Sequence, residues 1–180
     1  MKKQFVILFS LSSAFYFAQT KIEYKNIDVG FGGFSVKVKN SGAENESGGL
    51  TFNLSNTVRI DKNLISLDFL TGGGVGDGLV GVGGDYKFYR FNLLYGRSFK
   101  LLDWLAIEPN AGIGYYHQNS EMYFTDEQIK HSVVNFPLKV ALTTGASKRV
   151  GMGINAGYDI NKLNNTFSGN IFLRVNIVKD

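Results

Sequence analysis

Apolar and polar residues alternate with a period of two along most of the chain after residue 19, and this pattern constrains the fold more than any other feature. Residues 50–60 are the clearest case, because Leu50, Phe52, Leu54, Val58 and Ile60 fall on one face and polar residues fill the other, with Asn56 as the one exception. Such segments predict β-strands with one apolar face. No run of about 18 apolar residues follows residue 19, so any membrane span must be made of strands.

Eight segments of this kind are expected. They cover residues 27–39, 50–60, 64–71, 85–99, 105–115, 135–143, 151–160 and 170–177. In the first segment the alternation changes phase at Gly32-Gly33, which predicts a β-bulge. In the last segment Phe172 is expected to point inward, against the apolar pattern of its neighbours.

The connections between these segments alternate in length. Residues 61–63, 101–103 and 147–149 form short turns, and residues 40–49, 72–84, 118–132 and 161–166 form longer loops. Short turns on one rim and long loops on the other are typical of outer-membrane barrels. An even number of strands also places both termini on the short-turn side. The 22 glycines and 2 prolines suit a chain of strands and tight turns.

The first 19 residues have the features of an export signal. Lys2 and Lys3 precede an apolar stretch from Phe5 to Phe17, which is too short for a membrane-spanning helix. We therefore predict a cleaved signal peptide at residues 1–19 and one β-barrel domain at residues 20–180. Without the two lysines, 17 basic residues remain against 15 acidic ones, so nucleic acid is not an expected partner. The sequence has no cysteine and therefore no disulfide or thiolate metal site.

A soluble barrel of the lipocalin type also alternates, but the side chains argue against it. Each segment carries about four or five large apolar residues, and roughly 30 to 40 of them would not fit inside an eight-stranded barrel. The opposite face is mostly Gly, Ser, Thr and Asn with about one charge per strand, which suits a narrow lumen. We therefore expect an all-β, membrane-spanning, antiparallel up-and-down barrel of about eight strands with a polar, filled interior.

The expected inward face carries charges of both signs. They are Arg59, Asp68, Arg90, Glu108, Lys139, Asp159 and Arg174. Isolated buried ions are costly, so we expect a compensating network that fills the lumen. Glu108 is predicted to be its central acid, with Arg90, Lys139 and Arg174 as candidate bases. The alternative interpretation is a proton or ion path through a narrow, porin-like channel.

Aromatic residues gather near the two ends of the predicted strands. Tyr89, Tyr115, Phe136, Tyr158 and Phe167 lie near the long loops, while Phe99 and Trp104 lie near the short turns. Two interfacial girdles are expected from these positions.

Two motifs carry weaker chemical signals. Residues 76–81 match the GxGxxG spacing, but no strand-to-helix unit surrounds them, so a glycine-rich loop is favoured over a dinucleotide site. His117, Ser120, Asp126, Glu127 and His131 lie on or beside the longest loop, the one place where a nucleophile, a base and an acid could assemble. A solvated polar loop is favoured there. No catalytic, cofactor or metal site is predicted.

Taken with these features, the strings YGRSFKLLDWLAIEPNAGIGYY (95–116) and SGNIFLRVNI (168–177) resemble the strands of the small OmpX-like and OmpA-transmembrane-type barrels. The resemblance implies insertion into the cell outer membrane after export to the periplasm. The implied partners are outer-membrane lipid and lipopolysaccharide, the barrel-assembly machinery, and a protein bound by the long loops. The expected function is non-enzymatic: attachment, partner binding or envelope integrity. The alternatives are a lipid A-modifying acyltransferase or deacylase and a narrow channel.

Overall fold

The computed structural model describes residues 22–38, 45–76, 85–121, 128–145 and 148–178. These residues form antiparallel strands joined by short turns. The strands are β1 (Ile22–Val38), β2 (Asn45–Ile60), β3 (Asn63–Gly76), β4 (Asp85–Arg97), β5 (Phe99–Leu102), β6 (Leu105–Glu121), β7 (Gln128–Thr144), β8 (Val150–Ile160) and β9 (Asn164–Val178). No helix among the described residues is long and apolar enough to cross a membrane. The predicted signal peptide lies outside the described residues.

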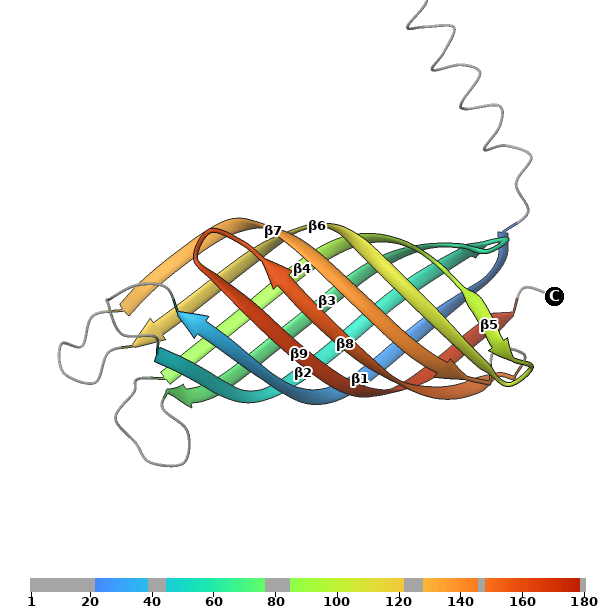
Figure 1. Cartoon of the computed structure of the whole chain (residues 1–180), viewed down its shortest axis with the longest axis horizontal. Helices are drawn as coiled ribbons and strands as arrows, with labels where there is room; N and C mark the ends of the chain where they lie inside the picture. The colour runs from blue at the N-terminus through green and yellow to red at the C-terminus, as the bar shows by residue number, and fades with distance from the viewer. Residues whose placement is uncertain (1–21, 39–44, 77–84, 122–127, 146–147, 179–180) are drawn as a thin grey trace, which may run out of the picture.

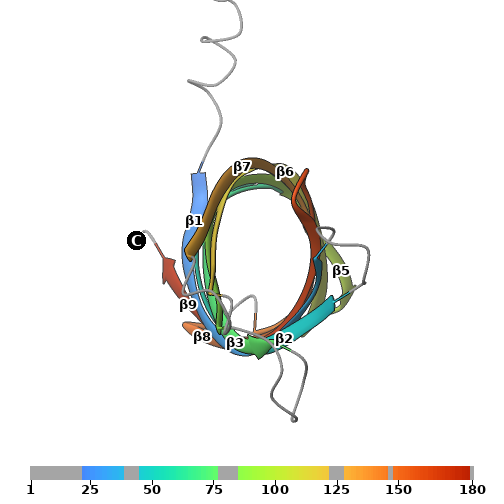
Figure 2. The same ribbon diagram turned by 90° about the vertical axis from the view of Figure 1, so that its left-hand side faces the viewer.

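The sheet closes on itself as an eight-stranded barrel. Strands that are consecutive in the sequence pair with each other, and β1 also pairs with β9, which joins the two ends of the sheet. Both β4 and β5 pair with β6, so they act as one strand interrupted at Ser98. At this break the Ser98 N–H donates a hydrogen bond of 2.8 Å to the Lys62 carbonyl. The strands run obliquely around the barrel axis (Figure 1), and the end-on view shows the closed ring (Figure 2). The predicted all-β, up-and-down barrel is confirmed.

The alternation predicted from the sequence separates the two faces of the barrel wall. Large apolar residues point outward: Leu50 on β2, Leu67 on β3 and Ile171 on β9 are 78%, 65% and 71% exposed. Most inward positions are occupied by small polar residues or glycine. Because apolar side chains cover the outside of every long strand, this surface is stable against lipid and not against water.

Several strands run further than the alternation predicted. Residues 45–49, 72–76, 118–121 and 128–132 continue strands although they were expected in loops. The period of two is weak there because glycine and polar residues replace the apolar members. The ladder of backbone hydrogen bonds needs no apolar face, so it continues beyond the part of the wall that meets hydrocarbon.

The predicted bulge at Gly32-Gly33 is wrong. The pairing of β1 with β2 and with β9 runs without a shift through both glycines. The apolar residues change parity along β1 because Phe34 and Val36 point into the barrel, where polar residues were expected. Gly32 is needed for another reason: a Cβ there would collide with the carbonyl oxygen of Gly169 on β9.

The rim at the long-loop end is uneven. Asn161 Oδ1 accepts hydrogen bonds from the N–H groups of Leu163 and Asn164, at 2.9 and 3.0 Å, so β8 and β9 meet in a tight turn instead of the expected loop at residues 161–166. This turn stops short of the rim (Figure 1). Strand β7 pairs with β8 only from Phe136 onward, and residues 128–135 extend past it. At the opposite end Tyr24 pairs with Val178, so the first and last strands end together on the short-turn side.

Candidate functional site: the barrel interior and its outer wall

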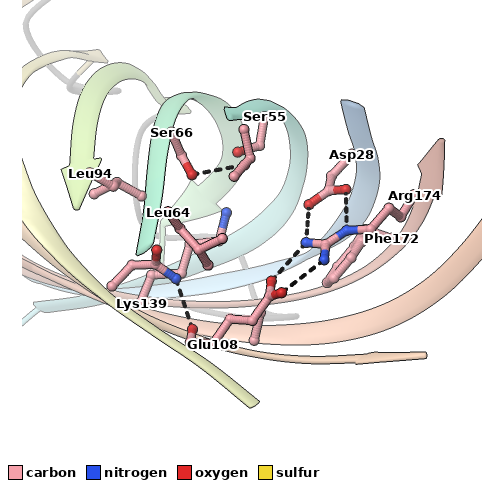
Figure 3. Close-up of a pocket in the computed structure, with 12 residues that line it drawn as sticks. Asp28, Ser55, Leu64, Ser66, Leu94, Glu108, Lys139, Phe172 and Arg174 are labelled. Carbon is pink, nitrogen blue, oxygen red and sulfur yellow. Dashed lines mark hydrogen bonds and ion pairs between the residues drawn. The ribbon is translucent and has the colours of Figure 1, made fainter. Parts of the chain in front are cut away.

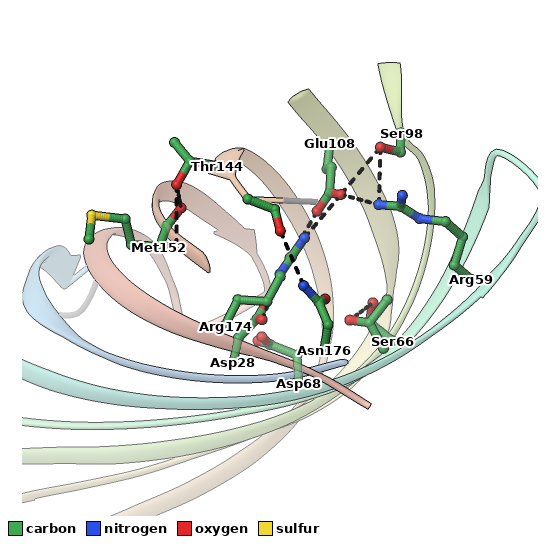
Figure 4. Close-up of polar contacts among 12 residues, drawn as sticks. Asp28, Arg59, Ser66, Asp68, Ser98, Glu108, Thr144, Met152, Arg174 and Asn176 are labelled. Carbon is green, nitrogen blue, oxygen red and sulfur yellow. Dashed lines mark hydrogen bonds and ion pairs between the residues drawn. The ribbon is translucent and has the colours of Figure 1, made fainter. Parts of the chain in front are cut away.

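The lumen contains a cluster of ion pairs toward its short-turn half. Arg174 binds Asp28 through two hydrogen bonds of 2.8 Å, from Nε to Oδ1 and from Nη2 to Oδ2. The same guanidinium group donates to Glu108 at 3.1 and 2.9 Å. Arg59 Nη2 approaches the other side of Glu108 at 2.7 Å. Figures 3 and 4 show the two carboxylates on either side of the Arg174 guanidinium. Two cations and two anions therefore form one neutral, buried cluster.

Ser98 joins this cluster at the break between β4 and β5. Its hydroxyl accepts from Arg59 Nη2 at 3.2 Å and donates to Glu108 Oε1 at 3.3 Å (Figure 4). The interruption of the strand thus supplies a polar group at the mouth of the lumen. Next to it a recess of about 460 Å³ opens between Arg59, Ser98, the exposed turn residues Asp61 and Lys62, and Lys100 on β5.

Two more ion pairs lie further along the barrel, each joining two strands. Lys139 on β7 reaches Asp68 on β3 at 2.6 Å, and Asn53 also donates to Asp68 at 3.0 Å. Arg90 on β4 pairs with Asp159 on β8, which also accepts from Asn135 at 2.6 Å. Each of these pairs joins non-adjacent strands, so they link opposite walls across the lumen.

The structure places all seven predicted charges inside the barrel but pairs them differently. Glu108 binds Arg174, as predicted, but its second base is Arg59 and not Arg90 or Lys139. Arg90 lies opposite Tyr116 in the β4–β6 register, eight residues beyond Glu108 and thus roughly 27 Å along the strand. Lys139 lies opposite Asn110 and turns to Asp68 instead. Strands β4 and β7 flank β6, as predicted, but the bases that bind Glu108 come from β2 and β9 on the other side of the lumen, and a single sequence does not show which strands meet there.

Sequence reasoning missed Asp28. Its parity on β1 matches the inward Asn26, and the closure of an eight-stranded barrel requires β1 to pair with β9. Asp28 is directly opposite Arg174 in that register. The signal was therefore present, but the supposed bulge in this segment obscured it.

A second layer, made of apolar and aromatic side chains, fills the lumen toward the long loops. It was not predicted. Its buried members are Phe34, Val36, Leu70, Tyr86, Phe88 and Tyr116, with Val133 packed against them. Phe88 stacks on Tyr116 with ring centroids 5.5 Å apart and meets Phe34 edge-on at 4.9 Å. Arg90 was predicted to point inward, and because residues two apart on a strand share a face, Phe88 and Tyr86 must point inward as well. Apolar residues on both faces of β4 hid this pattern.

Polar atoms of this layer bond among themselves. The Tyr86 and Tyr116 hydroxyls are 2.6 Å apart, and Asn164 donates to Tyr86 at 3.1 Å and to Gln118 at 2.6 Å. Beside the ion pairs a cavity of about 20 Å³ remains, lined by Glu108, Lys139 and Arg174 among others (Figure 3). Such a volume holds about one water molecule. The described interior is therefore packed and hydrogen-bonded along most of its length.

The predicted girdle residues all lie on the outside of the wall. Tyr89, Tyr115, Phe136, Tyr158, Phe167, Phe99 and Trp104 are each between 38% and 59% exposed. Phe99 belongs to β5 and Trp104 to the turn that follows, at the short-turn end. The other five lie on β4, β6, β7, β8 and β9.

The residues considered for catalysis are only partly brought together. His117 Nδ1 lies 2.8 Å from Ser132 Oγ on the outside of the wall, and Tyr115 donates to the same oxygen at 2.7 Å. His131 shares the inward parity of Val133, so it faces away from His117. Asp126 and Glu127 lie outside the described residues, as does most of the GxGxxG segment, and the Ser120 side chain is not described. In the described part of the chain, no group of three His, Asp or Glu side chains could hold a metal ion.

Comparisons with known proteins are informative at the level of structure. No protein-family model matches the chain, and no curated protein matches it in sequence. The Neisserial surface protein A structure superposes with a TM-score of 0.69 at 10% identity, over 84% of this chain and 96% of that one. Ail, the attachment invasion locus protein of Yersinia pestis, gives 0.61 at 12% identity, over 87% and 100%. The outer membrane protein OprG of Pseudomonas aeruginosa gives 0.60 at 11%, over 89% and 99%. The chain thus has the fold of the small eight-stranded outer-membrane β-barrels.

Proposed function

We propose that this protein is a non-enzymatic component of the bacterial outer membrane that acts through its long-loop end, in attachment, partner binding or maintenance of the envelope. The filled interior carries this proposal. Ion pairs and an aromatic layer occupy the lumen, so specific chemistry has to take place on the outer surface and rim. Export through the signal peptide, insertion by the barrel-assembly machinery and anchoring by the two aromatic girdles belong to the same proposal.

The shape of the rim supports binding of a partner there. Within the described strands, residues 128–135 of β7 pair only with β6, because the β8–β9 turn stops below them. A protruding strand with one unpaired edge can accept an extended segment of another protein. Ail, the attachment invasion locus protein of Yersinia pestis, is named for such an activity and has the same fold.

Loop exchange in living cells tests the proposal. Residues 39–44 and 122–127 are each replaced by Gly-Ser linkers of equal length, and the short turn Asp61-Lys62 is changed to Asn-Gly as a control. Attachment to matrix-coated surfaces and sensitivity to detergents are compared with a deletion strain. We expect the loop variants to behave like the deletion strain although they still form folded barrels, while the control behaves like wild type. The proposal would be contradicted if the loop variants gave the deletion strain the attachment and detergent resistance of wild type.

An outer-membrane lipid-modifying enzyme is the second candidate, because His117 and Ser132 are in contact on the lipid-facing wall. A nucleophile beside a base is the minimal requirement for acyl transfer, although a catalytic arrangement also needs an orienting group and oxyanion donors. Mass spectrometry of lipid A from cells with wild-type protein, Ser132→Ala and His117→Asn separates the two functions. A wild-type-specific change in acylation that both variants abolish would favour the enzyme.

A further inference from the structure

The outside of β4, β6 and β7 is ordered in rows set by the strand register. Moving toward the long loops, Leu93 lies opposite Ile113, and Phe91 opposite Tyr115. The next row is Tyr89, His117 and Ser132, and the row after it is Lys87, Asn119 and Lys130. Successive rows are two residues, or roughly 7 Å, apart along the strands. The wall thus changes from aliphatic to aromatic, then to polar and finally to cationic.

This order matches the passage from hydrocarbon to headgroups in a bilayer. Lys87 and Lys130 are both exposed and lie on strands separated only by β6, so their backbones are roughly 10 Å apart. Lysine side chains are long and flexible enough for two of them to converge on one anionic group between them. At the level where they lie, the anionic groups of a membrane are lipid phosphates.

The row below the lysines is held in a fixed arrangement. The Tyr89 ring stacks on the His117 ring with centroids 4.8 Å apart and an interplanar angle of 30°. Tyr115 donates its hydroxyl hydrogen to Ser132 Oγ, so the Ser132 hydroxyl can donate to His117 Nδ1. When Nδ1 accepts from Ser132, the His117 Nε2–H is a donor for another group.

We propose that this patch, defined by Lys87, Tyr89, His117, Asn119 and Lys130, binds the phosphorylated headgroup of an outer-leaflet lipid. The two lysines pair with a phosphate, and His117 and Asn119 contribute further hydrogen-bond donors. The inference rests on the proposed function only in placing the barrel in the outer membrane; it needs neither attachment nor partner binding.

Acidic residues near the patch need a control of their own. Asp85 and Glu121 follow at the same parity in the sequence, at the ends of β4 and β6. If the lysines served only to pair with these acids, Lys87→Gln/Lys130→Gln would lower the thermal stability of the protein in lipid-free micelles. It would not change the response to added lipid.

Lipid titration of the refolded, full-length mature protein in neutral micelles provides the test. The probes are diphosphorylated lipid A, the same lipid A without phosphates, and inorganic phosphate, and the readouts are the binding constant and the shift in unfolding temperature. The variant is Lys87→Gln/Lys130→Gln, and the matched control is Lys62→Gln/Lys148→Gln, which removes two exposed lysines from the short-turn rim.

Each lysine near an anionic surface contributes roughly a fivefold preference, so the patch variant should bind diphosphorylated lipid A about 25-fold more weakly than wild type. The control should bind within about twofold of wild type, and removal of the phosphates should abolish most of the difference. Equal losses in both double variants, no preference for the phosphorylated lipid, or equal stabilisation by inorganic phosphate would each overturn the proposal. The loop exchange measures attachment and the titration measures lipid binding, so the result of one does not change the result of the other. The two proposals can therefore fail separately.

Discussion

Arg174 on the last strand and Asp28 on the first lie directly opposite each other at the seam that closes the barrel, joined by two hydrogen bonds of 2.8 Å. The same arginine also binds Glu108 on β6. One side chain therefore ties the two ends of the sheet together and connects them to the opposite wall.

Replacing Arg174 should weaken the closed barrel more than replacing Asp28. Arg174→Met leaves two buried carboxylates without their shared partner, and breaking a buried pair from one side typically costs about 3 to 5 kcal/mol. Asp28→Asn should cost less, since Arg174 keeps Glu108. Unfolding in urea and the temperature at which the compact gel band converts to the unfolded one both measure this. Equal stability of Arg174→Met and wild type would contradict a structural role for the seam.

Double-mutant cycles test the pairing of Glu108. Glu108→Gln and Arg59→Met should be strongly coupled, because the two side chains are 2.7 Å apart. Glu108→Gln and Arg90→Met should be additive within about 0.5 kcal/mol, because Arg90 pairs with Asp159 far along the barrel. Asp103→Asn, in the exposed β5–β6 turn, serves as the surface control and should change stability by about 0 to 1 kcal/mol. Coupling of Glu108 to Arg90 but not to Arg59 would show that the register is wrong.

Arginine on the outer wall should be costly at mid-strand. Leu138 and Ile154 point outward and are 49% and 54% exposed, so Leu138→Arg or Ile154→Arg places a cation in hydrocarbon at a cost of about 2 to 4 kcal/mol. Ile154→Leu keeps the apolar surface and should be nearly neutral. Refolding into bilayers of defined thickness gives the comparison. Full tolerance of arginine at both positions would mean that this face does not meet lipid.

The sequence was sufficient for the central part of each strand and for the inward face of the seven predicted charges, because a period of two determines both. It was not sufficient for the partners. Glu108 and Arg90 are on adjacent strands, but the stagger of a tilted barrel separates them along its axis, and stagger depends on the whole ring of pairings. Asp28 opposite Arg174 was within reach of sequence reasoning, because closure of the barrel makes β1 and β9 neighbours and each strand carries one inward charge.

The inner aromatic layer was hidden for a different reason. On β4 the inward Tyr86 and Phe88 alternate with the outward Tyr89 and Phe91, so both faces are aromatic and hydrophobicity does not distinguish them. The long-loop ends of the strands were hidden as well, because they extend past the lipid and lose the apolar half of the pattern.

The ion pairs and the aromatic layer together close the lumen, which leaves the outer surface and the rim for function. Single-channel recording in planar bilayers tests this most directly, with Phe88→Ala/Tyr116→Ala/Arg174→Ala as a variant that removes side chains from both layers. The wild-type protein should insert without resolvable conductance steps over a range of voltages, while the variant, once shown to be folded, should give openings. Stable, reproducible steps from the wild-type protein would contradict the account, because they would require a continuous aqueous path past Arg174 and Phe88.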